Sequence, residues 1–295
     1  MRIHKTMIKI LIVFSVLLAL ALFVYWNNKS LVVTEYQYQS KQVPKQFEGF
    51  RITQISDLQS EYFGQHQKKL LTKTAETNPD IIVFTGDLLD RNHTSYEASL
   101  EAIKGLAKIA PVYYVNGNHE LALPEQRMKE FYDELRQMGV NVLFDETAAV
   151  TLGVQQIHLI GISEYTLYAS KESIGRTATA YDPSVINDVI DRLTESIGEE
   201  EFVVMLTHEP QFFDAYTNDK VDLIFAGHAH GGQIRLPFTE GLFAPGQGTL
   251  PKLTSGVHKK SHTTMVISRG LGNSVFPFRF MNRPEIVVVD LKRGL

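Results

Sequence analysis

Five short polar blocks carry side chains that ligate metals, and four of them directly follow a run of apolar, strand-like residues. Function in open α/β sheets collects at the carboxyl ends of strands, so we expect the five blocks to meet at one edge of a sheet. Such an edge would be suited to a hydrolytic centre with two metal ions. The blocks are Asp57-Leu58-Gln59, Gly86-Asp87, Gly117-Asn118-His119-Glu120, His208-Glu209 and Gly227-His228-Ala229-His230-Gly231-Gly232.

The donor set consists of Asp, Asn and His, and the chain contains no cysteine. Oxygen and imidazole donors without thiolate suit Mn²⁺, Fe²⁺ or Zn²⁺. Two such ions about 3.5–4 Å apart would bind both an attacking hydroxide and the oxygens of a phosphate, and Asp87 is the natural bridging carboxylate. A single histidine at a strand end is usually structural, as we expect for His4, His93 and His158. The conjunction of all five blocks favours the metal centre.

Apolar runs of strand length alternate with helix-like segments from Phe50 onward. This pattern predicts an α/β fold with two packed mixed β-sheets flanked by helices, and the closer spacing of the late strands indicates antiparallel pairing there. The predicted strands are Phe50–Ser56, Asp80–Gly86, Val112–Asn116, Gln156–Ser163, Phe202–Thr207, Val221–Ala226, Thr263–Ser268 and Glu285–Leu291. The predicted helices are Gln65–Asn78, Tyr96–Ile109, Pro124–Met138, Pro183–Ile197 and Pro210–Asn218; the Gly/Pro-rich segment Leu236–Ser261 is expected to be a long loop region.

An apolar run of 17 residues, Ile10 to Trp26, is broken only by Ser15 and follows Arg2, Lys5 and Lys9. Its length is just sufficient to cross a bilayer, and the positive-inside rule places the N-terminus in the cytoplasm and the rest outside. A cleaved signal peptide, ending near Ala19-Leu20-Ala21, and a buried core helix are the alternatives.

The expected organisation is a cytoplasmic stub and single-pass cell-membrane anchor over 1–27, a juxtamembrane segment over 28–49 that could contain an edge strand, and a catalytic domain over 50–295. Lys and Arg total 29 against 33 Asp and Glu, a net charge of -4. No basic excess indicates a nucleic-acid-binding surface.

The blocks resemble the signature of the calcineurin-like metallophosphoesterase family, which runs Asp-x-His, Gly-Asp, Gly-Asn-His-Glu, His, Gly-His-x-His. The sequence looks closest to the membrane-anchored bacterial phosphodiesterase branch, through Gly227–Gln233, Ser268–Ser274 and Arg283-Pro284-Glu285. The resemblance covers about residues 50–290 and implies a double β-sandwich flanked by helices. It also implies hydrolysis of a phosphodiester or pyrophosphate, with lipid-linked or nucleotide-sugar substrates in similar proteins.

The resemblance further implies a role for each site residue. Asp57, Asp87 and His230 would hold the first metal, with residue 59 completing that site. Asp87, Asn118, His208 and His228 would hold the second. His119 would be the general acid beside the phosphate, oriented by Glu120, and the nucleophile would be a metal-bound hydroxide.

Gln59 departs from the family pattern, which has histidine at this position. An amide oxygen is a neutral and weaker donor than imidazole, so we hypothesise a weaker first site shifted toward Mn²⁺ or Mg²⁺, with Mn²⁺ favoured for the centre as a whole. His66 is a candidate replacement ligand, although it is also placed to begin an exposed helix.

Three alternatives stay open at this point. Phe276, Phe278 and Phe280 alternate with other residues, which favours the buried face of a β-strand over an apolar lip facing lipid. The function could instead be that of a phosphomonoesterase of the same fold. Because Gln59 weakens the first site, a metal-binding sensor without turnover is the alternative from a different class.

Overall fold

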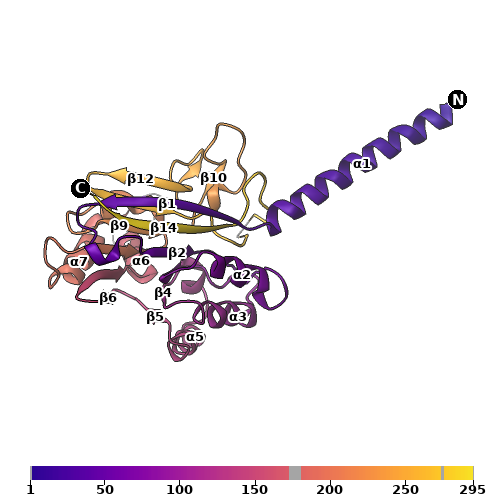
Figure 1. Cartoon of the computed structure of the whole chain (residues 1–295). Helices are drawn as coiled ribbons and strands as arrows, with labels where there is room; N and C mark the ends of the chain where they lie inside the picture. Colours follow the sequence, from indigo (N-terminus) through magenta and orange to yellow (C-terminus); the bar gives the residue numbers. More distant parts are fainter. Residues whose placement is uncertain (1, 173–180, 274–275, 295) are drawn as a thin grey trace.

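The computed structural model describes residues 2–172, 181–273 and 276–294, and these form four layers with a long helix projecting from one end (Figure 1). Two six-stranded sheets pack face to face, and helices cover the outer face of each. The predicted α/β sandwich is therefore confirmed.

The first sheet has the strand order β1-β14-β2-β3-β4-β5. Strands β2 to β5 run parallel, whereas β14 is antiparallel to β2 and parallel to the edge strand β1. The bounds are β1 Val32–Ser40, β2 Arg51–Ile55, β3 Ile81–Thr85, β4 Val112–Val115, β5 Asn141–Val142 and β14 Glu285–Arg293.

The second sheet has the order β12-β13-β9-β8-β7-β6. Strands β7, β8, β9 and β13 run parallel, and the antiparallel strands β6 and β12 close the two edges. The bounds are β6 Glu146–Leu152, β7 Gln155–Gly161, β8 Val203–Leu206, β9 Leu223–Ala226, β12 Gly256–Lys260 and β13 Thr263–Ile267. The expected antiparallel C-terminal region is thus only half right, because β13 and β14 each have one parallel and one antiparallel neighbour.

Side chains that alternate along the central strands fill three separate hydrophobic cores. In β3, Ile81 and Val83 point between the two sheets, while Ile82 and Phe84 point toward the first helical layer. The third core lies between the second sheet and the other helices. Strands covered on both faces need no polar face, which explains their continuously apolar sequences.

Helices α2, α3 and α5 cover the first sheet, and α6, α7 and α8 cover the second. Two of them begin at a side chain that caps the first turn, since Ser95 accepts from the N–H of Ala98 and Asp182 accepts from that of Ser184. The bounds are α2 Lys68–Glu76, α3 Tyr96–Leu106, α4 Asn118–Leu121, α5 Glu125–Gln137, α6 Glu164–Glu172, α7 Pro183–Thr194 and α8 Phe213–Tyr216, with 3-10 turns η1 Lys45–Phe47, η2 Gln65–Gln67, η3 Pro210–Phe212 and η4 His230–Gly232.

Helix α1, Arg2–Lys29, projects away from the sandwich, and its apolar side chains from Met7 onward are exposed, as with Ile10 at 64% and Phe14 at 62% (Figure 1). The interpretation of this segment as a core helix is therefore wrong. The helix has the length and composition needed to cross a membrane between Thr6 and Lys29. A signal sequence has the same properties, so that alternative stays open.

The segment Leu236–Ser261 is more ordered than the loop region that its glycines and prolines predict. It contains a small hairpin, β10 Phe243–Ala244 with β11 Gly248–Thr249, and the whole of β12. Strand β12 has the polar sequence of an exposed edge strand, which is why the apolar pattern does not reveal it.

Candidate metal centre

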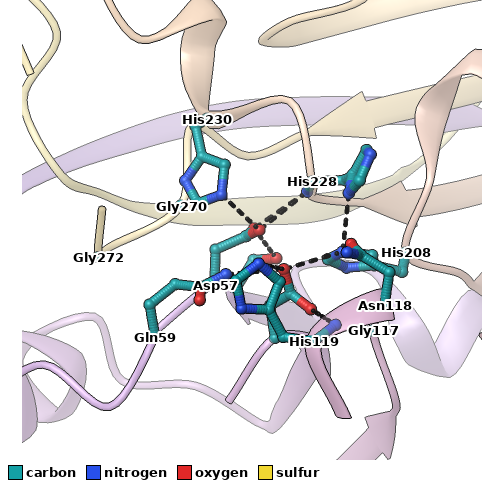
Figure 2. Close-up of polar contacts among 12 residues, drawn as sticks. Asp57, Gln59, Gly117, Asn118, His119, His208, His228, His230, Gly270 and Gly272 are labelled. Atoms are coloured by element: carbon teal, nitrogen blue, oxygen red, sulfur yellow. Dashed lines mark hydrogen bonds and ion pairs between the residues drawn. The ribbon is translucent and has the colours of Figure 1, made fainter. Parts of the chain in front are cut away.

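All five polar blocks converge, but they come from both sheets rather than from one edge of a single sheet. Asp57 and Gln59 follow β2, Asp87 follows β3, and Asn118 begins α4 directly after β4. The second sheet contributes the remaining blocks, with His208 after β8 and His228 and His230 after β9. The prediction of a common edge is corrected accordingly, and Figure 2 shows the side chains of both sheets pointing toward one another.

One half of the centre consists of Asp87, Asn118, His208 and His228. The ligand atoms of Asp87, His208 and His228 all lie within 4.8 Å of one another. The Nε2 atom of His208 lies 3.2 Å from Asn118 Oδ1, 3.1 Å from His228 Nδ1 and 3.3 Å from Asp87 Oδ2. Four donors from four elements therefore lie around a common volume, and Figure 2 shows those of Asn118, His208 and His228.

A hydrogen bond at this half-site leaves a lone pair of His208 directed inward. His208 Nδ1 lies 2.7 Å from the carbonyl oxygen of Thr85 and donates to it, which leaves Nε2 without a proton in the neutral ring. Burial lowers the pKa of His228 to about 4, so this imidazole is neutral at pH 7. A divalent cation fits this donor set, because it requires neutral histidines and an ionised carboxylate.

The charge balance supports the same conclusion. Burial alone would raise the pKa of the Asp87 carboxyl, but the imidazoles of His208 and His119 lower it below the ordinary value. Although burial would lower the pKa of His208, the neighbouring Asp87 carboxylate raises it. The pocket therefore attracts positive charge, which a metal ion supplies in place of protons.

The other half of the centre consists of Asp57, Gln59 and His230, and it shares Asp87. Ligand atoms of Asp57, Asp87 and His230 also lie within 4.8 Å of one another, and His230 Nε2 lies 3.4 Å from Asp57 Oδ1. The Gln59 amide nitrogen donates to Asp87 Oδ2 at 2.7 Å, and its buried Oε1 has no hydrogen-bond partner. An amide rotated by 180° would direct that oxygen to a cation, so Gln59 fits a ligand role only after this rotation.

Arg279 was not identified from the sequence, and it constrains the first half-site. Its side chain is fully buried, and its guanidinium donates to the carbonyl oxygens of Arg269 at 2.7 Å and Gly272 at 2.5 Å. The same guanidinium lies 3.2 Å from His230 Nδ1. Because a guanidinium has only donors, Nδ1 accepts and the proton of the neutral ring is on Nε2, which faces Asp57. As arranged, His230 presents an N–H toward Asp57 where a metal ligand would offer a lone pair.

The segment around Arg279 differs from the buried strand face expected for its phenylalanines. Phe276 and Phe278 are exposed at 42% and 36%, and Phe280 is partly buried, so these residues do not form the buried face of a strand. The buried side chain is the charged Arg279 between them. Alternation of apolar residues was misleading here because hydrogen bonds to Arg269 and Gly272, not apolar contacts, determine which side chain points inward.

His119 lies beside the centre with its ring between two carboxylates. Its Nε2 is 4.0 Å from Asp87 Oδ2, and its Nδ1 is 3.4 Å from Asp90 Oδ1. The Glu120 carboxylate instead accepts from the backbone N–H groups of Asp87, Leu89 and Gly117 at 2.8–3.0 Å. Glu120 thus supports the loops that carry Asp87 and Asn118, and the orienting role expected of it toward His119 is not among these contacts. The backbone N–H of Arg91 donates to His119 Nδ1 at 3.2 Å, and Asp90 lies on the same side of the ring.

The backbone at the centre is strained in a way that the sequence does not reveal. Asp57, Gln59, Asp87, His228 and His230 all have positive φ, between 47° and 65°. Such conformations are uncommon for residues with a side chain and persist at functional sites where the surrounding structure fixes them. The turn before Asp87 requires glycine at position 86, because the backbone lies close to His208 there. A Cβ on Gly86 would lie 2.6 Å from His208 Nδ1.

A cavity of about 680 Å³ opens beside Asn118 and His228. Its lining includes the cations Arg91 and Lys171 and the carboxyl groups of Glu164 and Glu209. Lys171 lies 2.7 Å from the buried carboxylate of Glu209, whose neighbour His208 is part of the centre. The cavity is larger than a phosphate group and leaves room for a substituent beyond it.

The remaining histidines lie elsewhere. His66 is exposed and paired with Glu101 at 2.9 Å, so it does not replace the missing imidazole. His158 lies 3.1 Å from Glu201 and has the structural role expected of it, and His93 is exposed near Asp90. In the segment Ser268–Ser274, the loop at Gly270 and Gly272 packs against Asp57 and Gln59, while Ser274 lies outside the described residues.

Comparisons with known proteins agree with this geometry. The calcineurin-like phosphoesterase family matches residues 50–232. An uncharacterized metallophosphoesterase of Bacillus subtilis, YkuE, is 31% identical over 91% of this chain and 88% of its own length. The phosphodiesterase YaeI of Escherichia coli is 25% identical over 73% of this chain and 72% of its own length. A transmembrane protein with a metallophosphoesterase domain from Danio rerio is 21% identical over 89% of this chain and 57% of its own length.

The match over residues 50–232 spans all five polar blocks. Members of this family bind divalent metals and hydrolyse phosphoric esters. The chain belongs to the calcineurin-like phosphoesterase family and is a phosphoric ester hydrolase.

Proposed function

We propose that the chain is a metal-dependent phosphodiesterase or pyrophosphatase with an asymmetric two-metal centre. The observation that carries this proposal is the pair of donor groups sharing Asp87, one with His208 and His228 and the other with Asp57 and His230. Asn118 completes the second half-site, and Gln59 and Arg279 make the first half-site the weaker one.

A divalent cation in the second half-site would polarise a phosphoryl oxygen and lower the pKa of a bound water. The residues of the chain do the rest. Asp87, His208 and His228 orient the centre, while Arg91 and Lys171 in the adjoining cavity attract the anionic substrate. His119 is the general acid, with its Nε2 facing the centre so that a proton can pass to the leaving oxygen.

The preference for a diester or pyrophosphate follows from the cavity and from the relatives. A volume of about 680 Å³ beside the centre accommodates a substituent on the phosphate. The YaeI protein is described as a phosphodiesterase. Both observations favour a phosphate that is substituted on each side over a simple monoester, and a lipid-linked or nucleotide-sugar substrate satisfies this description.

Membrane attachment through α1 is part of the proposal. The helix is long and apolar enough to span a bilayer, and one relative is described as a transmembrane protein. Arg2, Lys5 and Lys9 before the apolar run support an orientation with the N-terminus in the cytoplasm and the catalytic domain, residues 50–295, outside.

Turnover of bis-(p-nitrophenyl) phosphate and p-nitrophenyl phosphate with added Mn²⁺ tests the proposal. We expect the diester to be hydrolysed faster than the monoester, and His119→Ala to lower turnover by about 10²–10⁴-fold. His66→Ala is the matched control, because it removes an exposed histidine and should leave turnover unchanged. Preference for the monoester would indicate a phosphatase, and inactivity with every divalent metal would indicate a sensor.

A further inference from the structure

Lysines gather around a cavity at the end of α1, outside the metal centre. The cavity has a volume of about 550 Å³ and lies between the last turn of α1 and helix α2. Figure 1 shows α2 beside the point where α1 joins the sandwich. The lining residues are Lys29, Ser30, Leu31, Lys68, Lys69, Thr72, Lys73 and Glu76.

The lysines of this cavity outnumber its one acidic residue, Glu76. No ion pair joins Lys68, Lys69 or Lys73 to an acidic side chain within the part of the chain that the structure describes. Lys69 and Lys73 are four residues apart on α2, and like charges at this spacing destabilise a helix. Lys29 does pair with Glu61, and its ammonium lies 5.6 Å from the centre of the Phe63 ring.

The cavity also lies at the level where a bilayer would end. Tyr25 and Trp26, in the same helical turn as Lys29, are exposed at 68% and 51%. Aromatic residues of this kind concentrate at the membrane–water interface. Lysines next to such a belt face the phosphate groups of the lipids.

The end of α1 is held firmly against the domain, so the cavity keeps its shape. The Asn28 side chain accepts from the backbone N–H of Arg279 at 2.8 Å and donates to its carbonyl oxygen at 3.1 Å. The Arg283 side chain donates to the carbonyl oxygen of Ser30 at 3.0 Å, and its guanidinium lies 4.8 Å from the Trp26 ring.

We propose that this cavity binds the phosphate headgroup of an anionic phospholipid, an inference that rests on the proposed membrane attachment and not on catalysis. The ammonium groups of the α2 lysines contact the phosphate, and the acyl chains extend along the apolar surface of α1. None of the lining residues belongs to the metal centre. The site therefore fixes how the catalytic domain sits on the bilayer.

Native mass spectrometry of the full-length chain tests this, after release from mixed micelles that contain equal amounts of phosphatidylglycerol and phosphatidylcholine. A lysine near an anionic surface contributes about fivefold in affinity. We therefore expect Lys68→Glu with Lys69→Glu and Lys73→Glu to lower phosphatidylglycerol retention by roughly 100-fold. Hydrolysis of the diester by this triple variant should be unchanged, which shows that it folds.

A charge-matched variant separates the cavity from net charge. Lys41→Glu, Lys45→Glu and Lys259→Glu change exposed lysines away from α1 and should keep phosphatidylglycerol bound. Equal retention of both lipids by the unmodified chain, or equal losses in the two triple variants, would overturn the proposal. Displacement of the lipid by excess glycerol 3-phosphate would also overturn it, because the site would then be one for a soluble phosphate. Extraction of the unmodified chain from membranes by alkaline carbonate would remove its premise of attachment, and diester hydrolysis would be unaffected by that outcome.

Discussion

Replacement of Gln59 by histidine should strengthen the first half of the metal centre. In the unmodified chain, the Gln59 amide donates its N–H to Asp87 Oδ2 at 2.7 Å, and its Oε1 is buried without a partner. Metal binding must therefore break that hydrogen bond and rotate the amide. An imidazole at this position would offer a stronger nitrogen donor without the rotation.

The expected size of the effect follows from the two defects of this half-site. Loss of a partner outside the ligand set typically costs 10–100-fold in metal affinity, and loss of a ligand costs more. Gln59 is a poor ligand, and Arg279 holds His230 with its proton toward Asp57. We therefore expect the second Mn²⁺ to bind at least about 100-fold more weakly than the first, a difference of about 2.7 kcal/mol. Gln59→His should recover at least about tenfold of this, because Arg279 is unchanged.

Titration calorimetry of the metal-free protein with Mn²⁺ measures both dissociation constants. Electron paramagnetic resonance gives an independent reading, since isolated Mn²⁺ shows a six-line spectrum and a coupled pair does not. At one equivalent of Mn²⁺, the unmodified chain should show the six-line spectrum. At two equivalents of Mn²⁺, Gln59→His should show the spectrum of a coupled pair. Gln65→His adds the same imidazole on the surface and should change neither constant.

Two tightly bound ions in the unmodified chain and in Gln59→His alike would refute the reasoning. This result would mean that the Gln59 amide rotates at little cost in free energy and that the Arg279–His230 contact does not prevent His230 from binding the metal. A single ion in both proteins would instead show that Arg279 alone excludes the second cation, and Gln59 would not be the cause.

Three further predictions follow from particular contacts. His208→Ala should abolish tight binding of the first Mn²⁺ in calorimetry, whereas Gln59→Ala should leave it within about tenfold. Arg279→Met should lower the free energy of unfolding by about 3 kcal/mol, because two buried carbonyl groups lose their donor; thermal unfolding measures this, with the exposed Arg136→Met as the control. Burial raises the pKa of Asp222 to about 6. Between about pH 4 and 6 the Asp222 carboxyl is therefore protonated more fully in the folded state than in the unfolded chain. The free energy of unfolding consequently falls as the pH rises through that range. Asp222→Asn should therefore be more stable than the unmodified chain at pH 7.5, by up to about 3 kcal/mol, and the gain should vanish near pH 4; a gain that is independent of pH would contradict this assignment.

The fold was predictable from the sequence where a strand is covered on both faces. Runs such as Ile81–Thr85 and Val203–Leu206 are continuously apolar, and each was recognised within two residues of its bounds. Strands at sheet edges were missed, as with β6 and β12, because half or more of their side chains face solvent. Their pairing depends on neighbours far away in the sequence, which a local pattern does not contain.

The site was predictable to the extent that its residues occur in motifs. Asp87, Asn118, His208 and His228 were expected together and lie together, since each directly follows a strand whose position is determined by packing. Asp90 and Arg279 were not found. The first is a common residue in a loop, and the second interrupts an apolar pattern that conceals it. Long-range hydrogen bonds place both, and these have no sequence signature.

Arg279 connects two parts of the molecule that the sequence treats as separate. Its backbone pairs with the Asn28 side chain at the end of α1, and its side chain reaches His230 and the carbonyl oxygen of Gly272. The loop at Gly272 in turn packs on Gln59. Displacement of the end of α1 would therefore move the residue that holds the first half-site, whereas the second half-site, built from α4 and from residues after β3, β8 and β9, is joined to the first through the shared Asp87 and through the His228 N–H, which donates to Asp57. The half of the centre that contains Gln59 is thus the half joined to α1, so we expect the position of this helix to influence occupancy of the first site more than that of the second.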